Sequence, residues 1–404
     1  MSRLRIAVLV SGTLAATAAA ATTSSTAATT DLQTALSRAL TAEGIDGRHT
    51  GALAVDLQTG EIVFERNSRA SLKPASAEKL AVSFAALRLL GPRFRFRTEV
   101  VGIGERNGRA WEGDLVLVGH GDPTLALEDI DGLARRVRSR GIRRITGRVL
   151  GDERHFDLRR DAPGWKYGFT GIESRPLSAL SVEGVPVPGL NASAASAARA
   201  LTAALERRGV AVDGVARGGR APEGALPLAA DVSEPLAQIV RHMNRESDNF
   251  YAELVLKELG ASMTGLGTSE AGAQVVLDEL RRADVSVRGV RIADGSGLSL
   301  DDRLTAQALI AILLAGAKSR QISDAFVTSL AVAGISGTLE DRLATRPTRS
   351  RVIAKTGTTN AASALAGFVR RRYVFAILQN GSPVPYWTAQ VAQDRFVTVL
   401  ARAK

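Results

Sequence analysis

The strongest constraint on the fold is a change of pattern in the middle of the chain. From about residue 91 to residue 230 glycines are frequent and apolar runs are short, as over residues 115–118. Outside this stretch the patterns are longer, with apolar residues at helical spacing over 76–90 and further helical patterns after Pro235. This arrangement predicts one α/β domain that is split in two by an inserted β-rich module.

The two outer parts, residues 31–90 and 231–404, are expected to form this domain, and residues 91–230 the inserted module. A chain of 404 residues is long enough for both. Helices are predicted over residues 31–43, 76–90, 195–208, 236–243, 250–259, 270–283, 306–315 and 387–401, a hairpin over 51–65, and strands over 351–358, 363–369 and 373–378.

The first 21 residues have the order of a secretory signal peptide. Arg3 and Arg5 precede a short apolar run over residues 6–14, and small residues follow it. Residues 22–30 contain only Ala, Ser and Thr and are predicted to be a spacer. We therefore expect an exported protein that works in the periplasm or elsewhere outside the cytoplasmic membrane. An uncleaved membrane anchor is the alternative.

Composition excludes several kinds of site. The chain has no cysteine, so disulfides, thiolate metal sites and cysteine nucleophiles are impossible. Its four histidines are not spaced as a zinc-binding pair, and no metal or other cofactor is expected. The net charge of +11 comes from dispersed basic residues without an aromatic-rich motif, so nucleic acid is not an expected partner. An anionic wall or membrane surface, or no specific partner, fits this charge as well.

Three short motifs in order carry the chemistry. They are an S-x-x-K pattern from Ser76 to Lys79, an S-D-N pattern from Ser247 to Asn249, and a K-T-G pattern that begins at Lys355. Each alone is a weak signal. Together, each in its expected structural context, they are typical of serine enzymes that form an acyl-enzyme.

Ser76 is the predicted nucleophile, because the first turn of a helix favours developing negative charge. Lys79 lies one turn further on the same face and is the predicted base, since burial or a nearby cation lowers the pKa of a lysine. Arginine cannot do this, and only seven of the 52 basic residues are lysines, two of them in the motifs. Backbone N–H groups of Ser76 and Thr358 would form the oxyanion hole.

The remaining motif residues are expected to move a proton and to bind the substrate. Ser247 is predicted to pass a proton to the leaving amine, and Asn249 to donate its amide to the substrate backbone. Lys355 and Thr356 are expected to bind the terminal carboxylate of the substrate. Gly357 is expected to let the substrate approach the strand closely.

These motifs resemble those of the class C low-molecular-mass penicillin-binding proteins, the penicillin-binding protein 4 type of D-alanyl-D-alanine carboxypeptidase and endopeptidase. The resemblance implies a β-lactamase-like transpeptidase fold, in which helices cover an antiparallel sheet and the active site lies between the sheet and a helical subdomain. It also implies peptidoglycan stem peptides as substrates and β-lactams as acylating inhibitors. The family-like segments are PASAEKL at Pro74, GHGDPTL at Gly119, RESDNFYAELVLKELG at Arg245, DGSGLS at Asp294, AGISGTLEDR at Ala333 and AKTGTTNAASALAGFV at Ala354.

The chain departs from the family in two places. The stretch between Ser76 and Ser247 is shorter than usual, so one of the family's two inserted domains is expected to be reduced or absent. After DGSGLS the family commonly has an arginine that helps to bind the diaminopimelate side chain, whereas this chain has Leu300, for which Arg303 could substitute. By resemblance, Asp152 is a candidate for binding the same side chain, and a turn-capping role is the alternative.

Three further residues are candidates by resemblance. Phe156 follows Asp152 in a family-like segment and is a second candidate for the same substrate side chain. Asp294 and Ser296 of DGSGLS either line the cleft or form a turn.

Two other functions share these features. A serine β-lactamase has the same fold and motifs, but the chain has no clear E-x-x-x-N segment for its deacylating base, and the inserted module argues against it. A non-catalytic wall-binding protein would not need every motif residue. The motifs do not distinguish removal of a terminal D-Ala from cleavage of a cross-link, because both reactions break the same D,D-peptide bond.

Overall fold

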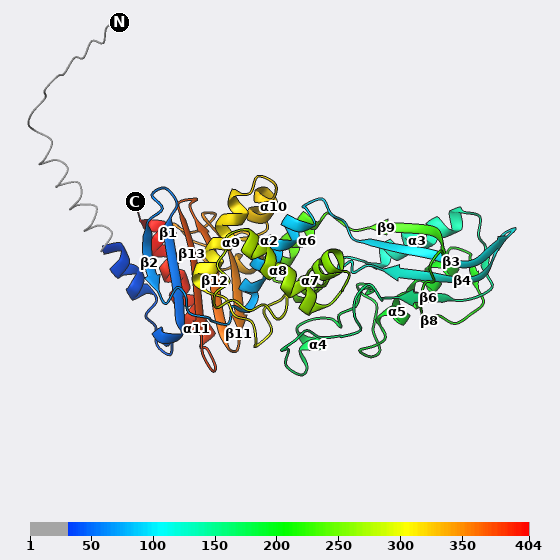
Figure 1. Cartoon of the computed structure of the whole chain (residues 1–404), viewed down its shortest axis with the longest axis horizontal. Helices are drawn as coiled ribbons and strands as arrows, with labels where there is room; N and C mark the ends of the chain where they lie inside the picture. Colours follow the sequence, from blue (N-terminus) through cyan, green and yellow to red (C-terminus); the bar gives the residue numbers. More distant parts are fainter. Residues whose placement is uncertain (1–30, 404) are drawn as a thin grey trace, which may run out of the picture.

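The computed structural model describes residues 31–403. The predicted signal peptide, residues 1–21, and the predicted spacer, residues 22–30, lie outside the described part. Figure 1 shows an elongated molecule with a sheet at each end and a group of helices between them. Within residues 31–403 no helix combines the length and the apolar character that crossing a membrane requires.

The first sheet has six strands in the order β10-β11-β12-β13-β1-β2, and all neighbouring strands are antiparallel. This sheet combines strands from the early and the late parts of the chain. Leu53 of β1, for example, lies opposite Ala376 of β13. Its strands are β1 (Thr50–Asp56), β2 (Ile62–Arg66), β10 (Ala331–Val332), β11 (Val352–Thr359), β12 (Ala362–Val369) and β13 (Tyr373–Asn380).

Helices cover both faces of this sheet. On one face α11 (Tyr386–Arg402) and a helix over residues 31–39 contribute Phe396 and Leu36 to a buried cluster. On the other face helix α2 (Lys79–Leu89) is buried on nearly all sides, as expected for a helix that is apolar all round. It shares one core with α6 (Leu236–Arg245), α7 (Asn249–Thr264), α8 (Ser269–Arg282), α9 (Ala306–Lys318) and α10 (Ser323–Thr328).

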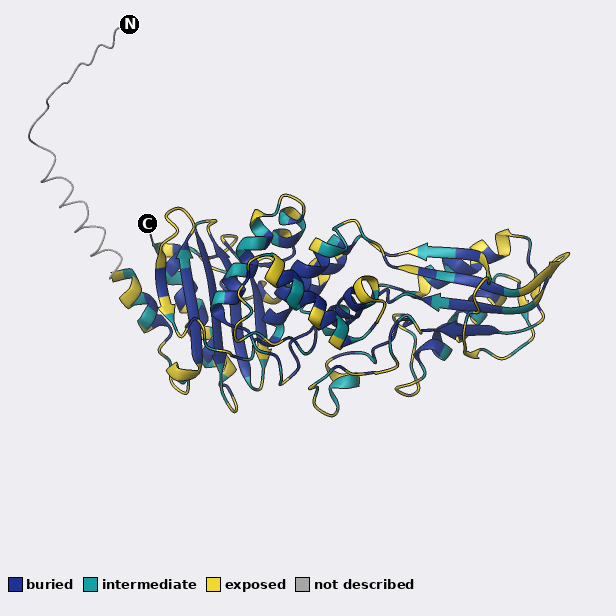
Figure 2. Ribbon diagram, viewed as in Figure 1, coloured by how far each residue is buried: buried dark blue, intermediate teal, exposed yellow. Residues whose placement is uncertain are grey.

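A second sheet of seven strands is built from residues between Arg97 and Val232. Helices α3 (Leu127–Ser139) and α5 (Ser193–Arg207) pack against it around a core of their own. Figure 2 shows that the long β3–β4 hairpin is buried near the helices and exposed at its far end. The strands are β3 (Arg97–Asn107), β4 (Ala110–Gly119), β5 (Arg144–Ile145), β6 (Val149–Asp152), β7 (Ala211–Val212), β8 (Arg217–Gly218) and β9 (Leu226–Val232).

The mixed α/β fold class predicted from the sequence is confirmed, and most predicted helices and strands agree within a few residues. Two local differences have physical reasons. Helix α3 was not predicted, because Gly132 interrupts its helical pattern. The helix expected from Ser76 begins instead as a 3₁₀ turn, η2 (Ala75–Glu78), before α2. The remaining short elements are η1 (Gly47–His49), η3 (Gly337–Leu339) and an irregular turn, α4 (Phe169–Ile172).

Candidate active site

Ser76 lies in the η2 turn, directly before α2. The preceding residue, Ala75, has a φ of 47°, a left-handed conformation that is strained for a residue with a side chain. Two glycines allow other segments to lie against this turn. A side chain at Gly297 would meet the Ala75 carbonyl oxygen at 1.9 Å, and one at Gly357 would meet the Ser76 nitrogen at 3.0 Å. The turn that carries Ser76 is therefore packed between the loop after residue 294 and strand β11.

The amine of Lys79 is held by three oxygen atoms. Its Nζ atom lies 3.0 Å from Ser76 Oγ, 2.8 Å from Asn249 Oδ1 and 2.6 Å from the Ser296 carbonyl oxygen. The amide orientation of Asn249 is fixed because its Nδ2 donates to the Glu173 carbonyl oxygen at 2.9 Å. The Asn249 and Ser296 oxygens can only accept hydrogen bonds. In a neutral amine they take both N–H groups, so the lone pair points at the Ser76 hydroxyl.

Burial lowers the pKa of Lys79 from 10.5 to about 8, against the opposing effect of nearby carboxylates, of which Asp294 is the strongest. Lys79 is completely buried. Burial and the proximity of Asp294 also raise the pKa values of Glu78 and Glu253, that of Glu253 to about 8. The raised pKa values favour the protonated forms of both carboxyl groups, which carry no charge next to the amine. A lysine in these surroundings gives up its proton far more readily than one in water.

The S-D-N motif lies where the chain passes from helix α6 to helix α7, between the two helices predicted over residues 236–243 and 250–259. Ser247 has a φ of 61°, and Asp248 caps α7 by accepting the Tyr251 N–H at 2.9 Å. This cap fixes Asn249 as the first residue of α7, facing Lys79. The Oγ atom of Ser247 accepts a hydrogen bond from Lys355 at 2.8 Å, which joins the second motif to the third.

The K-T-G motif lies on strand β11, where β10 pairs only with Ile353 and Ala354, so the strand continues past the end of β10. Lys355 is completely buried, and its burial, assisted by the charge of Lys79, holds its pKa well below the usual value. Thr356 Oγ1 lies 2.8 Å from Thr338 Oγ1. Because β11 alternates, Thr356 and Thr358 lie on one side of the strand and Lys355 on the other.

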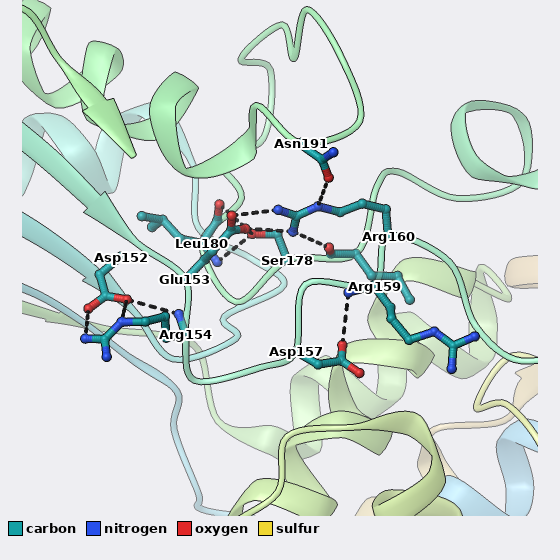
Figure 3. A network of polar contacts seen from close by, with 10 residues as sticks. Asp152, Glu153, Arg154, Asp157, Arg159, Arg160, Ser178, Leu180 and Asn191 are labelled. Atoms are coloured by element: carbon teal, nitrogen blue, oxygen red, sulfur yellow. Dashed lines mark hydrogen bonds and ion pairs between the residues drawn. The ribbon is translucent and has the colours of Figure 1, made fainter. Parts of the chain in front are cut away.

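Asp152 does not join this cluster. It lies at the end of β6, where its carboxylate accepts hydrogen bonds from Arg154 at 2.6 Å and from the Ala221 N–H at 2.9 Å, as Figure 3 shows in part. Burial raises the pKa of Asp152, but these bonds outweigh it and the net pKa is lowered. The substrate-binding role of Asp152 stays a prediction. Phe156 is 3% exposed and packs in an apolar cluster with Phe250.

The structure resolves the two interpretations of the DGSGLS segment. Asp294 forms the turn, because its buried carboxylate accepts hydrogen bonds from the backbone of the following loop, and the Ser296 carbonyl oxygen faces Lys79. Glu253 was not predicted and holds the same loop by accepting the N–H groups of Gly295 and Ser296. Its only signal in the sequence is its position one helical turn after Asn249.

A cavity of about 840 Å³ adjoins the second motif. Ser247, Asp248 and Asn249 line it, together with residues between 171 and 190. Ser76 and Lys355 are not among its lining residues. The cavity therefore extends from the second motif towards residues 171–190.

The chain matches the model of one protein family, described as the D-Ala-D-Ala carboxypeptidase 3 (S13) family, over residues 32–185 and 179–402. It is 28% identical to a D-alanyl-D-alanine carboxypeptidase of Actinomadura sp. (strain R39), over 88% of this chain and 82% of that protein. It is 32% identical to carboxypeptidase DacB of Mycolicibacterium smegmatis, over 91% of this chain and 83% of that protein.

Solved structures of penicillin binding protein 4 from Haemophilus influenzae have the same fold. The TM-score is 0.80 for one crystal structure and 0.75 for another, which is a complex with a β-lactam. Both alignments cover 92% of this chain and 98% of the solved chain, at 22% and 21% identity. The predicted fold, with helices over an antiparallel sheet and a second sheet inserted between motifs, is that of these structures.

Proposed function

The chain belongs to the D-Ala-D-Ala carboxypeptidase 3 (S13) family, and we propose that it hydrolyses the terminal D-Ala-D-Ala bond of peptidoglycan stem peptides through an acyl-enzyme on Ser76. One observation carries the proposal. The buried amine of Lys79 has two acceptor-only oxygens and the Ser76 hydroxyl as its three neighbours. A neutral amine held in this way is a base aimed at one hydroxyl group.

In the proposed first step, Ser76 Oγ attacks the carbonyl carbon of the penultimate D-Ala while its proton moves to Lys79 Nζ. Backbone N–H groups of Ser76 and Thr358 stabilise the oxyanion. The C–N bond then breaks, and the proton that Lys79 took from Ser76 passes through Ser247 to the leaving amine of the last D-Ala, which leaves Lys79 neutral. The Asn249 amide exchanges its present partner, the Glu173 carbonyl oxygen, for the substrate backbone.

In the proposed second step, water attacks the ester carbon of the acyl-enzyme. Lys79, again neutral, takes a proton from this water, and the ester C–O bond breaks with return of the proton to Ser76 Oγ. The products are a free D-alanine and a shortened stem peptide. Lys355 and the two threonines of K-T-G-T, Thr356 and Thr358, are proposed to bind the carboxylate of the outgoing residue.

β-Lactams are proposed to acylate the same serine. Attack of Ser76 Oγ on a lactam carbonyl opens the ring, and the leaving amine stays attached to the acyl group, so it remains in the cleft and hinders water. The complex of the Haemophilus influenzae protein with a β-lactam supports this part of the proposal.

A cross-link contains the same D,D-peptide bond, so endopeptidase cleavage is a second proposed activity. It differs only in the size of the group on the leaving amine. The cavity of about 840 Å³ next to Ser247 and Asn249 supports it, because a larger peptide needs room beside the motif that handles the leaving amine.

The proposed substrate lies outside the cytoplasmic membrane. We therefore propose that residues 1–21 direct export and that the enzyme works in the periplasm or the cell wall. In the same proposal residues 31–90 and 231–404 are the DD-peptidase domain, and residues 91–230 are the inserted module.

The decisive experiment is covalent labelling by a fluorescent penicillin, followed by intact mass measurement of the wild-type protein and the Ser76→Ala variant. An adduct on the wild type alone that persists for minutes supports the proposal. Rapid release of hydrolysed penicillin would instead identify a serine β-lactamase. A folded wild-type protein that neither keeps nor hydrolyses penicillin would be a non-catalytic wall-binding protein.

A further inference from the structure

The carboxylate of Asp294 is completely buried and accepts five hydrogen bonds. Four come from its own loop. Oδ1 accepts the N–H groups of Ser296 at 3.1 Å and Gly297 at 2.7 Å, while Oδ2 accepts the Ser296 hydroxyl at 2.9 Å and the Ser299 N–H at 2.8 Å. The fifth comes from Trp165, whose indole Nε1 donates to Oδ2 at 2.8 Å.

These bonds fix the loop that holds the proposed base. The Ser296 carbonyl oxygen of this loop accepts the shortest hydrogen bond of Lys79, at 2.6 Å. The same loop lies against the turn that carries Ser76, because Gly297 has no space for a side chain beside the Ala75 carbonyl oxygen. A movement of this loop would therefore change both the direction of the Lys79 lone pair and the support of Ser76.

Trp165 is the donor that comes from outside the loop, in the inserted module. A second contact joins the same two segments, because the Leu300 N–H donates to the Gly164 carbonyl oxygen at 3.3 Å. Gly164 itself lies so close to the loop that a side chain there would meet Ser299 Oγ at 2.2 Å. The contact is therefore a packed one between the inserted module and the loop after Asp294.

We propose that Trp165 and Asp294 are positioning residues that couple the inserted module to the catalytic lysine. The indole holds the carboxylate, the carboxylate holds the loop, and the loop presents the Ser296 carbonyl oxygen to Lys79. The inference rests on the proposed roles of Ser76 and Lys79 and adds to them a requirement for the inserted module. Neither residue touches the reacting atoms.

The test is the Trp165→Phe variant, which keeps an aromatic ring and removes the indole N–H. Its matched control is Trp111→Phe, since Trp111 is also in the inserted module and its Nε1 donates to a carbonyl oxygen, that of Ile103, at 3.2 Å. The rate constant of acylation by a fluorescent penicillin is measured for both variants and the wild type between about pH 6 and pH 10.

We expect acylation of Trp165→Phe to fall about tenfold, because a hydrogen bond to a charged group is lost and the base is misaligned. The rising limb of its pH profile should also move to lower pH. A displaced Ser296 carbonyl no longer stabilises the ammonium form of Lys79, so the pKa of Lys79 falls. Mere loss of stability would not move this limb, and Trp111→Phe should keep the wild-type profile.

An acylation rate and pH profile of Trp165→Phe equal to those of Trp111→Phe would overturn the inference. Should Trp165→Phe fail to fold, Ser296→Ala removes another donor from Asp294 Oδ2 with a smaller change of volume. It should show the same shift of the rising limb, and an unchanged profile would overturn the inference as well. Failure of the wild type to be acylated would instead count against the proposed function.

Discussion

The Nζ atom of Lys355 lies 2.8 Å from the Oγ atom of Ser247, across 108 residues of sequence. This hydrogen bond connects strand β11 of the first sheet with the segment between helices α6 and α7, on the two sides of the proposed cleft. Among the described residues the partners of Lys355 Nζ are Ser247 Oγ and the Thr356 carbonyl oxygen and not a carboxylate, and burial holds the pKa of Lys355 well below the usual value. A substrate carboxylate at this place would raise that pKa again and would bind the cation so formed.

The first prediction concerns recognition of this carboxylate. Wild-type enzyme should cleave a D-Ala-D-Ala peptide with a free carboxylate about tenfold or more faster than the same peptide with a terminal amide. In Lys355→Met the two rates should become similar. Lys257 is equally buried but is paired with Asp157, so Lys257→Met should keep the preference. An undiminished preference in Lys355→Met would contradict the assigned role.

The second prediction concerns the base. Arginine stays protonated at every accessible pH, so Lys79→Arg should be acylated about 100- to 10,000-fold more slowly than the wild type. Rates of adduct formation with penicillin, followed by intact mass, measure this. Lys257→Arg provides the control for a buried lysine outside the site. Retention of rapid acylation by a folded Lys79→Arg protein would remove Lys79 from the mechanism.

The third prediction concerns pH. The pKa of Lys79 is lowered to about 8, and only its neutral form accepts the Ser76 proton. The acylation rate constant should therefore rise with pH, by about tenfold for each unit below this pKa, and level off above it. Stopped-flow measurements with penicillin test this, with the thermal unfolding midpoint recorded at each pH as the control. A rate that is constant or falls from pH 7 to pH 9 would disprove the assignment.

The fourth prediction concerns the stability of the inserted module. Arg160 forms a buried bidentate ion pair with Glu153, with N–O distances of 2.7 and 2.6 Å. It also donates a hydrogen bond to the Leu177 carbonyl oxygen, and Figure 3 shows part of this network. Its neighbour Arg159 forms an exposed pair with Glu270. Arg160→Ala should lower the free energy of unfolding by about 3–5 kcal/mol, because Glu153 is left as an unpaired buried charge.

Arg159→Ala is the matched control and should change the free energy of unfolding by less than about 1 kcal/mol. Thermal unfolding and hydrogen exchange over residues 153–191 measure both variants. Equal protection of this segment in the two variants would show that the buried pair does not hold it.

The sequence identified the motif residues because each carries its chemistry in a side chain at a recognisable spacing. The structure joins Ser76, Lys79 and Asn249 in one set of hydrogen bonds, and Ser247 and Lys355 in another. The helices and strands of the two outer parts were also predictable, because their apolar periods are long. Helix α3 was not, since Gly132 interrupts its pattern.

Other parts of the site leave no trace in the sequence. The Ser296 carbonyl oxygen belongs to the backbone, which no residue type marks. Trp165 reaches Asp294 across 129 residues, a distance that only the folded chain spans. Gly357 was expected to give the substrate room, whereas in the structure its missing side chain also makes room for the turn that carries Ser76.

The position of Trp165 should make its fluorescence sensitive to acylation of Ser76. The chain has three tryptophans. Trp111 is enclosed in the core around the second sheet, and Trp387 is largely exposed at the start of α11. Trp165 alone among them donates to a carboxylate next to the turn that carries Ser76. Intrinsic fluorescence of the unlabelled enzyme should therefore report each acylation as it happens, and the signal should disappear in Trp165→Phe.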